Sequence, residues 1–144
     1  MDPRDPDWEA RIHRAFAGQA MMTHLGIELV EVAPGAATLR AAIRPELTQH
    51  HGYAHAALAF ASGDTAAGMA AQSLMAADEG VLTIEMKINL LAPAKGEALI
   101  ARGRVERAGR TVTVVRSDVY AQDAGAERHV ATLLGTMAVI KGLG

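Results

Sequence analysis

The chain of 144 residues contains no cysteine. This absence excludes a disulfide framework, a thiol nucleophile and cysteine-ligated zinc, and it fits a reducing compartment. The chain also lacks an excess of either charge, because 14 Lys and Arg residues stand against 16 Asp and Glu residues. A protein without a basic field is a poor match for nucleic acid or for a charged membrane surface. We therefore expect a small-molecule ligand and no nucleic-acid or membrane partner.

The sequence also predicts neither a membrane span nor a secretion signal. The most apolar stretch, residues 54–77, is interrupted by polar residues that include His55, Ser62 and Gln72, and the carboxylate of Asp64 near its centre would be costly in lipid. The acidic start, MDPRDPDWEAR, lacks the basic flank and apolar run of a secretory signal. We expect a cytoplasmic protein.

Half of the residues are apolar, which is enough for one compact domain with a core and too little for two comfortable ones. No repeat or Pro/Ser-rich linker divides the chain. Residues 1–144 are therefore expected to form a single domain, with residues 1–7 loose at its start.

The pattern of apolar residues predicts both helices and strands. Residues 81–90 alternate strictly between apolar and polar side chains, which is the clearest strand signal in the chain. Five further strands are predicted at 26–32, 37–43, 97–107, 110–121 and 128–140, and helices at 8–16 and 54–77.

The long predicted helix is apolar nearly all round, so it belongs inside the protein. Short turns between strands predict antiparallel neighbours, which gives a hairpin, the buried helix and then a four-strand meander. The fold class is therefore α+β, with an antiparallel sheet of about six strands curled around one long central helix and a short N-terminal helix.

Asp64 is the only Asp, Glu, Lys or Arg between Ala54 and Ala77. Desolvation disfavours a charged carboxylate in such surroundings, so the residue needs a compensating contact or a chemical role. A hydrogen bond to a neighbouring loop or subunit and a catalytic role both remain open from the residues alone. Its helical neighbours at three, four and seven residues are all apolar: Ala57, Phe60, Ala61, Ala67, Gly68 and Ala71.

The residues around Asp64 follow a pattern that supports the catalytic interpretation. Gln49 stands fifteen residues before Asp64, with His55-Ala56-Ala57 between them. This arrangement resembles the hot-dog-fold acyl-CoA thioesterases of the phenylacetate-degradation type, in which an Asn or Gln and a His-Gly-Gly precede a catalytic acid. The resemblance continues through LTIEMKINLLAPAKGE at 82–97, GRT at 109–111 and VATLLGTMAV at 130–139.

The resemblance implies hydrolysis of acyl-CoA to a carboxylate and free coenzyme A, without a metal or another cofactor. Asp64 would act as general base or nucleophile. Gln49 and the backbone N–H of Ala56 would polarise the thioester oxygen, since alanine supplies the same N–H as the glycine of the family. Thr83 aligns with a Ser or Thr that holds the attacking water in some relatives.

Four further residues are candidates for substrate binding. Residues 95–116 carry six Lys and Arg against two Glu, which fits a solvated face of the sheet or a site for the phosphates of coenzyme A, with Arg110 as the first choice. The other three lie at the start of the predicted helix or after Asp64: His55, Ala57 and Gly68. His51 and His55 have the spacing of helical metal ligands, but no third ligand is evident and no metal site is expected.

Spacing also predicts the assembly. Eight helical residues separate Ala56 from Asp64, which corresponds to about 12 Å and is too far for both to serve one carbonyl group. We therefore expect a homodimer with shared active sites, as the resemblance also implies, with a dimer of dimers as an extension.

Two other functions fit part of the pattern. An acyl-thioester dehydratase or hydratase of the same fold would pair a His with an acid, and His50 lies fourteen residues before Asp64. A non-catalytic module that senses acyl-CoA is the second, although such a module has no need of a buried carboxylate.

Overall fold

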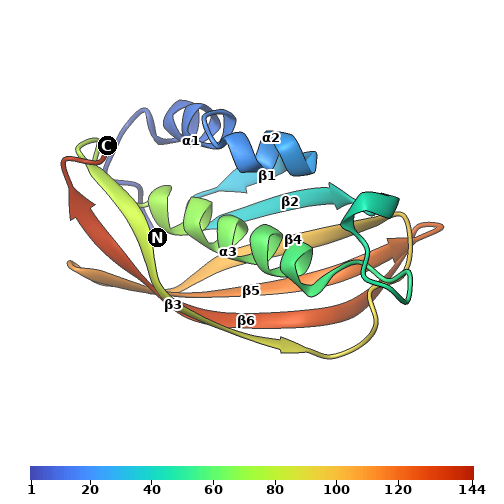
Figure 1. The fold of residues 1–144 in the computed structure, drawn as a ribbon. Coiled ribbons are helices and arrows are strands. Elements are labelled where there is room, and N and C mark those ends of the chain that lie inside the picture. Colours follow the sequence, from blue (N-terminus) through green and yellow to red (C-terminus); the bar gives the residue numbers. More distant parts are fainter.

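One antiparallel sheet curls around one helix in the computed structural model, which describes residues 1–144 (Figure 1). The helix α3 (Ala56–Gln72) lies along the inner face of the sheet. The six strands are β1 (Ile27–Ala33), β2 (Ala36–Ala42), β3 (Glu79–Leu90), β4 (Ala98–Ala108), β5 (Val112–Asp123) and β6 (Ala126–Lys141). Their order in the sheet is β1-β2-β4-β5-β6-β3. The predicted hot-dog architecture is confirmed.

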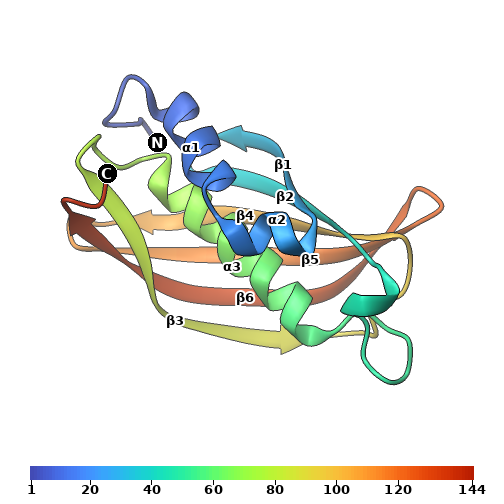
Figure 2. The same ribbon diagram turned by 45° about the horizontal axis from the view of Figure 1, so that its top comes forward.

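Two short helices and a 3-10 turn complete the fold. The helices α1 (Trp8–Ala17) and α2 (Ala20–Leu25) lie beside α3 on the side of β1 and β2 (Figure 2), and the turn η1 covers Pro45–Leu47. The sequence predicts α1 but not α2, whose six residues are too few to show a helical period. No helix in the structure has the length and apolar character needed to cross a membrane.

The predicted four-strand meander is wrong in its first step. β3 pairs with β6 instead of β4, and β4 pairs with β2. The connection at residues 91–97 can reach about 23 Å, whereas the three strand spacings from β3 to β4 amount to about 14 Å. This connection therefore crosses from one edge of the sheet to its middle. As a result β3 is an edge strand.

The helix α3 is shorter than the predicted helix at 54–77, since it covers only residues 56–72. Ser73 terminates it: the hydroxyl donates to the carbonyl of Ala70 at 2.7 Å and accepts the N–H of Gly35 at 2.8 Å. These two bonds satisfy a free carbonyl at the helix end and tie that end to the β1–β2 turn.

Small residues let α3 lie directly on the sheet. A Cβ atom at Gly103 of β4 would stand 2.3 Å from the carbonyl carbon of Ala66 and 2.4 Å from the nitrogen of Ala67. A Cβ atom at Gly63 would stand 2.8 Å from Cδ1 of Leu133 on β6. The backbone of α3 is thus held against β4 and β6 immediately around the position of Asp64.

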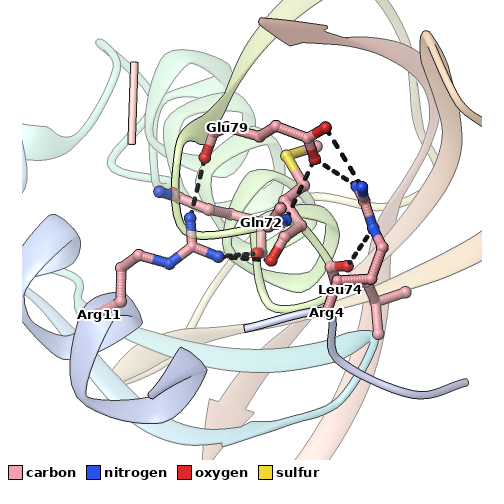
Figure 3. A network of polar contacts seen from close by, with 7 residues as sticks. Arg4, Arg11, Gln72, Leu74 and Glu79 are labelled. Atoms are coloured by element: carbon pink, nitrogen blue, oxygen red, sulfur yellow. Dashed lines mark hydrogen bonds and ion pairs between the residues drawn. The ribbon is translucent and has the colours of Figure 1, made fainter. Parts of the chain in front are cut away.

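Arg11 of α1 closes the C-terminal end of α3 (Figure 3). This side chain is buried, and it donates to the carbonyl oxygens of Gln72 at 3.3 Å, Met75 at 2.7 Å and Glu79 at 2.9 Å. The carboxylate of Asp5 lies 2.8 Å from its Nε atom. A cation at this end of a helix satisfies free carbonyls and opposes the negative end of the helix dipole.

Arg4 is a second arginine that binds groups near the C-terminal end of α3. The guanidinium of Arg4 pairs with the carboxylate of Glu79 and donates to the carbonyl of Leu74 at 3.3 Å (Figure 3). The hydrogen bond from Arg4 holds the pKa of Glu79 below its ordinary value. Residues 1–7, which the sequence predicts to be loose, therefore include two residues in defined contacts, Arg4 and Asp5.

Candidate active site

Asp64 lies near the middle of α3 and faces the edge strand β3. Its Oδ1 atom accepts a hydrogen bond of 2.9 Å from the hydroxyl of Thr83. Burial of the carboxyl group raises the pKa of Asp64, and the hydrogen bond from Thr83 offsets part of that rise. The carboxylate is thus a stronger base than an exposed aspartate.

A β-bulge brings Thr83 to the inner face of β3. The pairing of β3 with β6 shifts between Thr83 and Glu85. Without this shift, Thr83 would lie on the face opposite Met86, because side chains alternate along a strand. With it, both residues face inward, where Met86 packs against the core and Thr83 meets Asp64.

Exposed apolar residues lie next to Thr83 on β3 and one turn from Asp64 on α3. Leu82 and Ile84 flank Thr83 on β3 and are 55% and 58% exposed. Phe60, one helical turn before Asp64, is 37% exposed. The predicted apolar face of this strand is therefore only partly buried. An open strand edge with such side chains is a surface suited to covering by another chain.

The first turn of α3 forms a second group of candidate residues. The Nδ1 atom of His55 accepts the N–H of Ala57 at 2.9 Å, and its carbonyl accepts the N–H of Leu58 at 2.9 Å. His55 therefore caps the helix in the place that Ser, Thr, Asp or Asn usually takes. The N–H of Ala56 has no acceptor within the chain.

Gln49 is fixed by the loop that leads to α3. Its N–H donates to the carbonyl of Tyr53 at 2.9 Å, and its side-chain oxygen accepts the N–H of His51. The side-chain amide nitrogen makes no hydrogen bond within the chain, so its two N–H donors remain available.

Gln49 and Ala56 meet in one hollow of about 480 Å³. Asp64 and Thr83 do not line it. The remaining lining residues come from the loop before α3, from α3 itself, from the end of β3 with the connection after it, and from β6: Tyr53, Ala54, Ala59, Leu90, Leu91, Ala92, Pro93, Ala94 and Val130. The sequence does not predict Tyr53 or residues 90–94 as part of a site. A local turn brings Tyr53 to Gln49, whereas only the long-range fold brings residues 90–94 there.

The candidate substrate-binding residues are spread over three other places. His55 and Ala57 line a separate hollow of about 210 Å³ next to α2. Gly68 is buried near Met137 and Val81. Arg110 lines a hollow of about 410 Å³ at the C-terminal end of α3.

The arginines of β4 and β5 are mostly neutralised by acidic neighbours. Arg102 makes two hydrogen bonds to Glu127, of 2.7 and 2.8 Å. Arg104 pairs with Asp118 at 3.2 Å, and Arg116 with Glu106 at 3.2 Å. Arg110 makes no ion pair within the chain, so its charge is available to a ligand. No three His, Asp or Glu side chains lie close enough together to hold a metal ion.

Comparison with known proteins identifies relatives of this chain. The family model of the thioesterase superfamily matches residues 51–127. A thioesterase family protein from Silicibacter pomeroyi is 38% identical, with a TM-score of 0.92 over 94% of this chain and 99% of that chain. The PaaI protein of the E. coli phenylacetic acid degradation operon is 21% identical, with a TM-score of 0.86 over 96% and 97% of the two chains. Thioesterase HI1161 from Haemophilus influenzae is 19% identical, with a TM-score of 0.81 over 90% and 89%. The last two likenesses show the fold.

Proposed function

This chain belongs to the thioesterase superfamily, and we propose that it hydrolyses acyl-CoA thioesters to a carboxylate and free coenzyme A. Family membership supports thioester hydrolysis as the class of reaction. The observation that carries the finer proposal is the half-buried carboxylate of Asp64, which is held by Thr83 beside an open strand edge.

The thioester oxygen binds at the first turn of α3 in this proposal. The free N–H of Ala56 and the side-chain amide of Gln49 line one hollow, and both are donors without an acceptor in the chain. As the carbonyl carbon becomes tetrahedral, its oxygen gains negative charge, which these donors and the positive end of the helix dipole stabilise.

Asp64 supplies the base in the proposed reaction. It removes a proton from a water molecule, whose oxygen attacks the carbonyl carbon; the carbon–sulfur bond then breaks, and the coenzyme A thiolate leaves and takes up a proton. The raised pKa of Asp64 suits this role, because a stronger base accepts the proton more readily. The Thr83 hydroxyl orients one carboxylate oxygen and leaves Oδ2 for the water.

Each active site takes residues from two subunits in this proposal. Ala56 and Asp64 are eight helical residues apart, about 12 Å, so one chain does not bring both to a single carbonyl. Asp64 also lies outside the hollow that holds Ala56. We propose a homodimer in which Asp64 and Thr83 of one subunit face Gln49 and Ala56 of the other. The open, apolar edge of β3 supports this contact.

Arg110 binds a phosphate of coenzyme A in the same arrangement. Its hollow adjoins Ala71 near the end of α3, about 22 Å along the helix from Ala56. Within one chain, Arg110 therefore lies at the opposite end of α3 from the thioester site. His55 is assigned to capping the helix rather than to direct substrate contact.

The first test is a thiol-release assay across short, medium, long and aromatic acyl-CoAs, run with the wild type and Asp64→Asn. We expect the variant to fold and to lose activity by about 1,000-fold, within the range that general-base catalysis contributes. A folded Asp64→Asn protein with wild-type activity contradicts the proposal.

The shared site has its own test, because two inactive variants should complement each other. Asp64→Asn and Gln49→Ala chains are co-expressed and purified as a statistical mixture. Half of the dimers are then mixed, and each mixed dimer has one intact site, so about a quarter of wild-type activity should return. If all catalytic groups came from one chain, no activity would return.

The alternative functions receive less support from the geometry. His50, which a dehydratase would need beside Asp64, is exposed and does not line the hollow of Gln49 and Ala56. Its ring lies against that of His51 at a centroid distance of 3.9 Å, with the two planes tilted by 44°. Interconversion of hydroxyacyl- and enoyl-CoA without thiol release would identify a dehydratase instead. Tight acyl-CoA binding with no thiol release at any pH would identify a sensing module.

A further inference from the structure

The hollow that contains Gln49 and Ala56 has no charged residue in its lining. Nine of its eleven lining residues are hydrophobic, and the two polar ones, Gln49 and Tyr53, are uncharged. Its deepest lining residues are buried by this chain alone: Ala54, Ala59 and Val130 are 7%, 3% and 1% exposed. A partner subunit can cover the mouth of the hollow, but this chain builds its floor.

We propose that this hollow binds the acyl group and that the substrates are acyl-CoAs whose acyl group is uncharged and apolar, to the exclusion of acyl groups that end in a carboxylate. This inference rests on the proposed thioesterase function, because the oxygen of the thioester must bind at Ala56 for the acyl carbons to enter the hollow.

The exclusion of a carboxylate follows from desolvation. A terminal carboxylate in the hollow would leave water and would find no Lys, Arg or His in the lining to compensate for it. Lys95 follows Ala94 in the sequence, but it is exposed and does not line the hollow. An apolar chain of the same length has the opposite balance, since each buried methylene group improves binding about fourfold.

The depth of the hollow is set by alanines on two walls. Ala59 belongs to α3, and Ala92 belongs to the connection after β3. A larger side chain at either position would extend into the space that the acyl chain occupies. Substitutions at Ala59 and Ala92 therefore test the same hollow from two different structural elements.

The test compares two six-carbon substrates that differ only at the far end of the acyl chain. We measure kcat/KM for hexanoyl-CoA and for adipoyl-CoA, which ends in a carboxylate. The expected ratio is about 100-fold or more in favour of hexanoyl-CoA, because a buried carboxylate without a partner is strongly disfavoured.

Two variants then locate the effect in the hollow. Ala59→Leu and Ala92→Leu should each lower the ratio of kcat/KM for hexanoyl-CoA to that for butyryl-CoA by about tenfold, since small changes in pocket volume have effects of this size. Ala77→Leu, an exposed position outside the lining, is the matched control and should leave the ratio unchanged. Ala92 is only partly buried, so its variant serves the test if Ala59→Leu does not fold.

The outcomes separate this inference from the function on which it rests. Equal hydrolysis of hexanoyl-CoA and adipoyl-CoA overturns the inference and leaves the thioesterase function standing. An unchanged chain-length ratio in the folded leucine variants also overturns it, because the acyl chain would then bind elsewhere. A protein that hydrolyses no thioester overturns the proposed function and this inference together.

Discussion

The hydroxyl of Thr83 on the edge strand β3 donates a hydrogen bond of 2.9 Å to Asp64 on the central helix. This bond connects the candidate catalytic carboxylate to the one strand of its neighbourhood that has a free edge. It also lowers a pKa that burial raises, so Thr83 adjusts the basicity of Asp64 in addition to orienting it.

The pH profile of Thr83 variants tests this adjustment. In the proposed reaction Asp64 is active when ionised, so kcat/KM falls as the pH falls through its pKa. Thr83→Val removes the donor that lowers this pKa, so the acidic limb of the profile should move to higher pH. Thr83→Ser keeps the donor and should retain the wild-type limb. A valine variant whose limb stays in place or moves to lower pH contradicts the assignment.

Asp64→Asn is expected to stabilise the fold at alkaline pH. The pKa of Asp64 is raised in the folded protein, so the carboxyl group favours folding at low pH and loses this contribution as the pH rises through the folded-state pKa. Asparagine carries no charge and still offers an oxygen to Thr83. The Tm of the variant should exceed that of the wild type at pH 8, and the difference should shrink at acidic pH. A Tm difference that grows at acidic pH would show that another group dominates.

The role of His55 as the N-terminal cap of α3 can be tested by replacing its side-chain hydrogen-bond acceptor. His55→Asn supplies an oxygen that can accept the N–H of Ala57, whereas His55→Leu supplies none. We expect the leucine variant to lose about 1 kcal/mol of stability and about tenfold in kcat, because the helix start that presents Ala56 is no longer fixed. The asparagine variant should stay near wild type in both measurements. If it loses as much kcat as the leucine variant, the imidazole ring itself contacts the substrate.

Gly103→Ala tests the close contact of α3 with β4. The new methyl group would stand 2.3 Å from the backbone of Ala66, which a flexible side chain cannot relieve. We expect a loss of at least about 3 kcal/mol in the free energy of unfolding, measured by chemical denaturation. Gly18→Ala is the control, because its Cβ would make only ordinary contacts at 3.5 Å and its φ of −78° suits alanine.

Arg11→Met tests the closure of the C-terminal end of α3. Methionine keeps much of the apolar stem but leaves three carbonyl groups without a donor and Asp5 buried without a cation. The expected cost is about 3 kcal/mol, as for other broken buried ion pairs. Arg14→Met, an exposed position on the same helix, should change stability by less than about 0.5 kcal/mol. Equal effects of the two variants would rule out the closure as a source of stability.

Local patterns were sufficient to predict the strands and the buried helix, because alternation and helical spacing depend on near neighbours. The order of the strands depends on pairing between residues that are distant in the sequence, and for that reason the predicted meander was wrong. The sequence of residues 91–97 does not indicate that this connection crosses the sheet to reach β4. The six residues of α2 are too few to carry a helical period.

The candidate site was likewise predictable from the sequence only in part. The spacing of Gln49, Ala56 and Asp64 could be read from the sequence, and so could their separation into two groups along the helix. The contact between Thr83 and Asp64 could not be derived from alternation, which places Thr83 on the face opposite Met86. Only the bulge reverses this placement, and a bulge leaves no mark in a pattern of apolar residues.

The clamp formed by Arg11 has a consequence for the order of events during synthesis. The three carbonyl groups that this side chain binds lie 61, 64 and 68 residues further along the chain. A nascent chain therefore presents α1 before its docking site has left the ribosome, and the amphipathic face of that helix stays uncovered meanwhile. The three hydrogen bonds of Arg11 can therefore form only after residues 72–79 have left the ribosome.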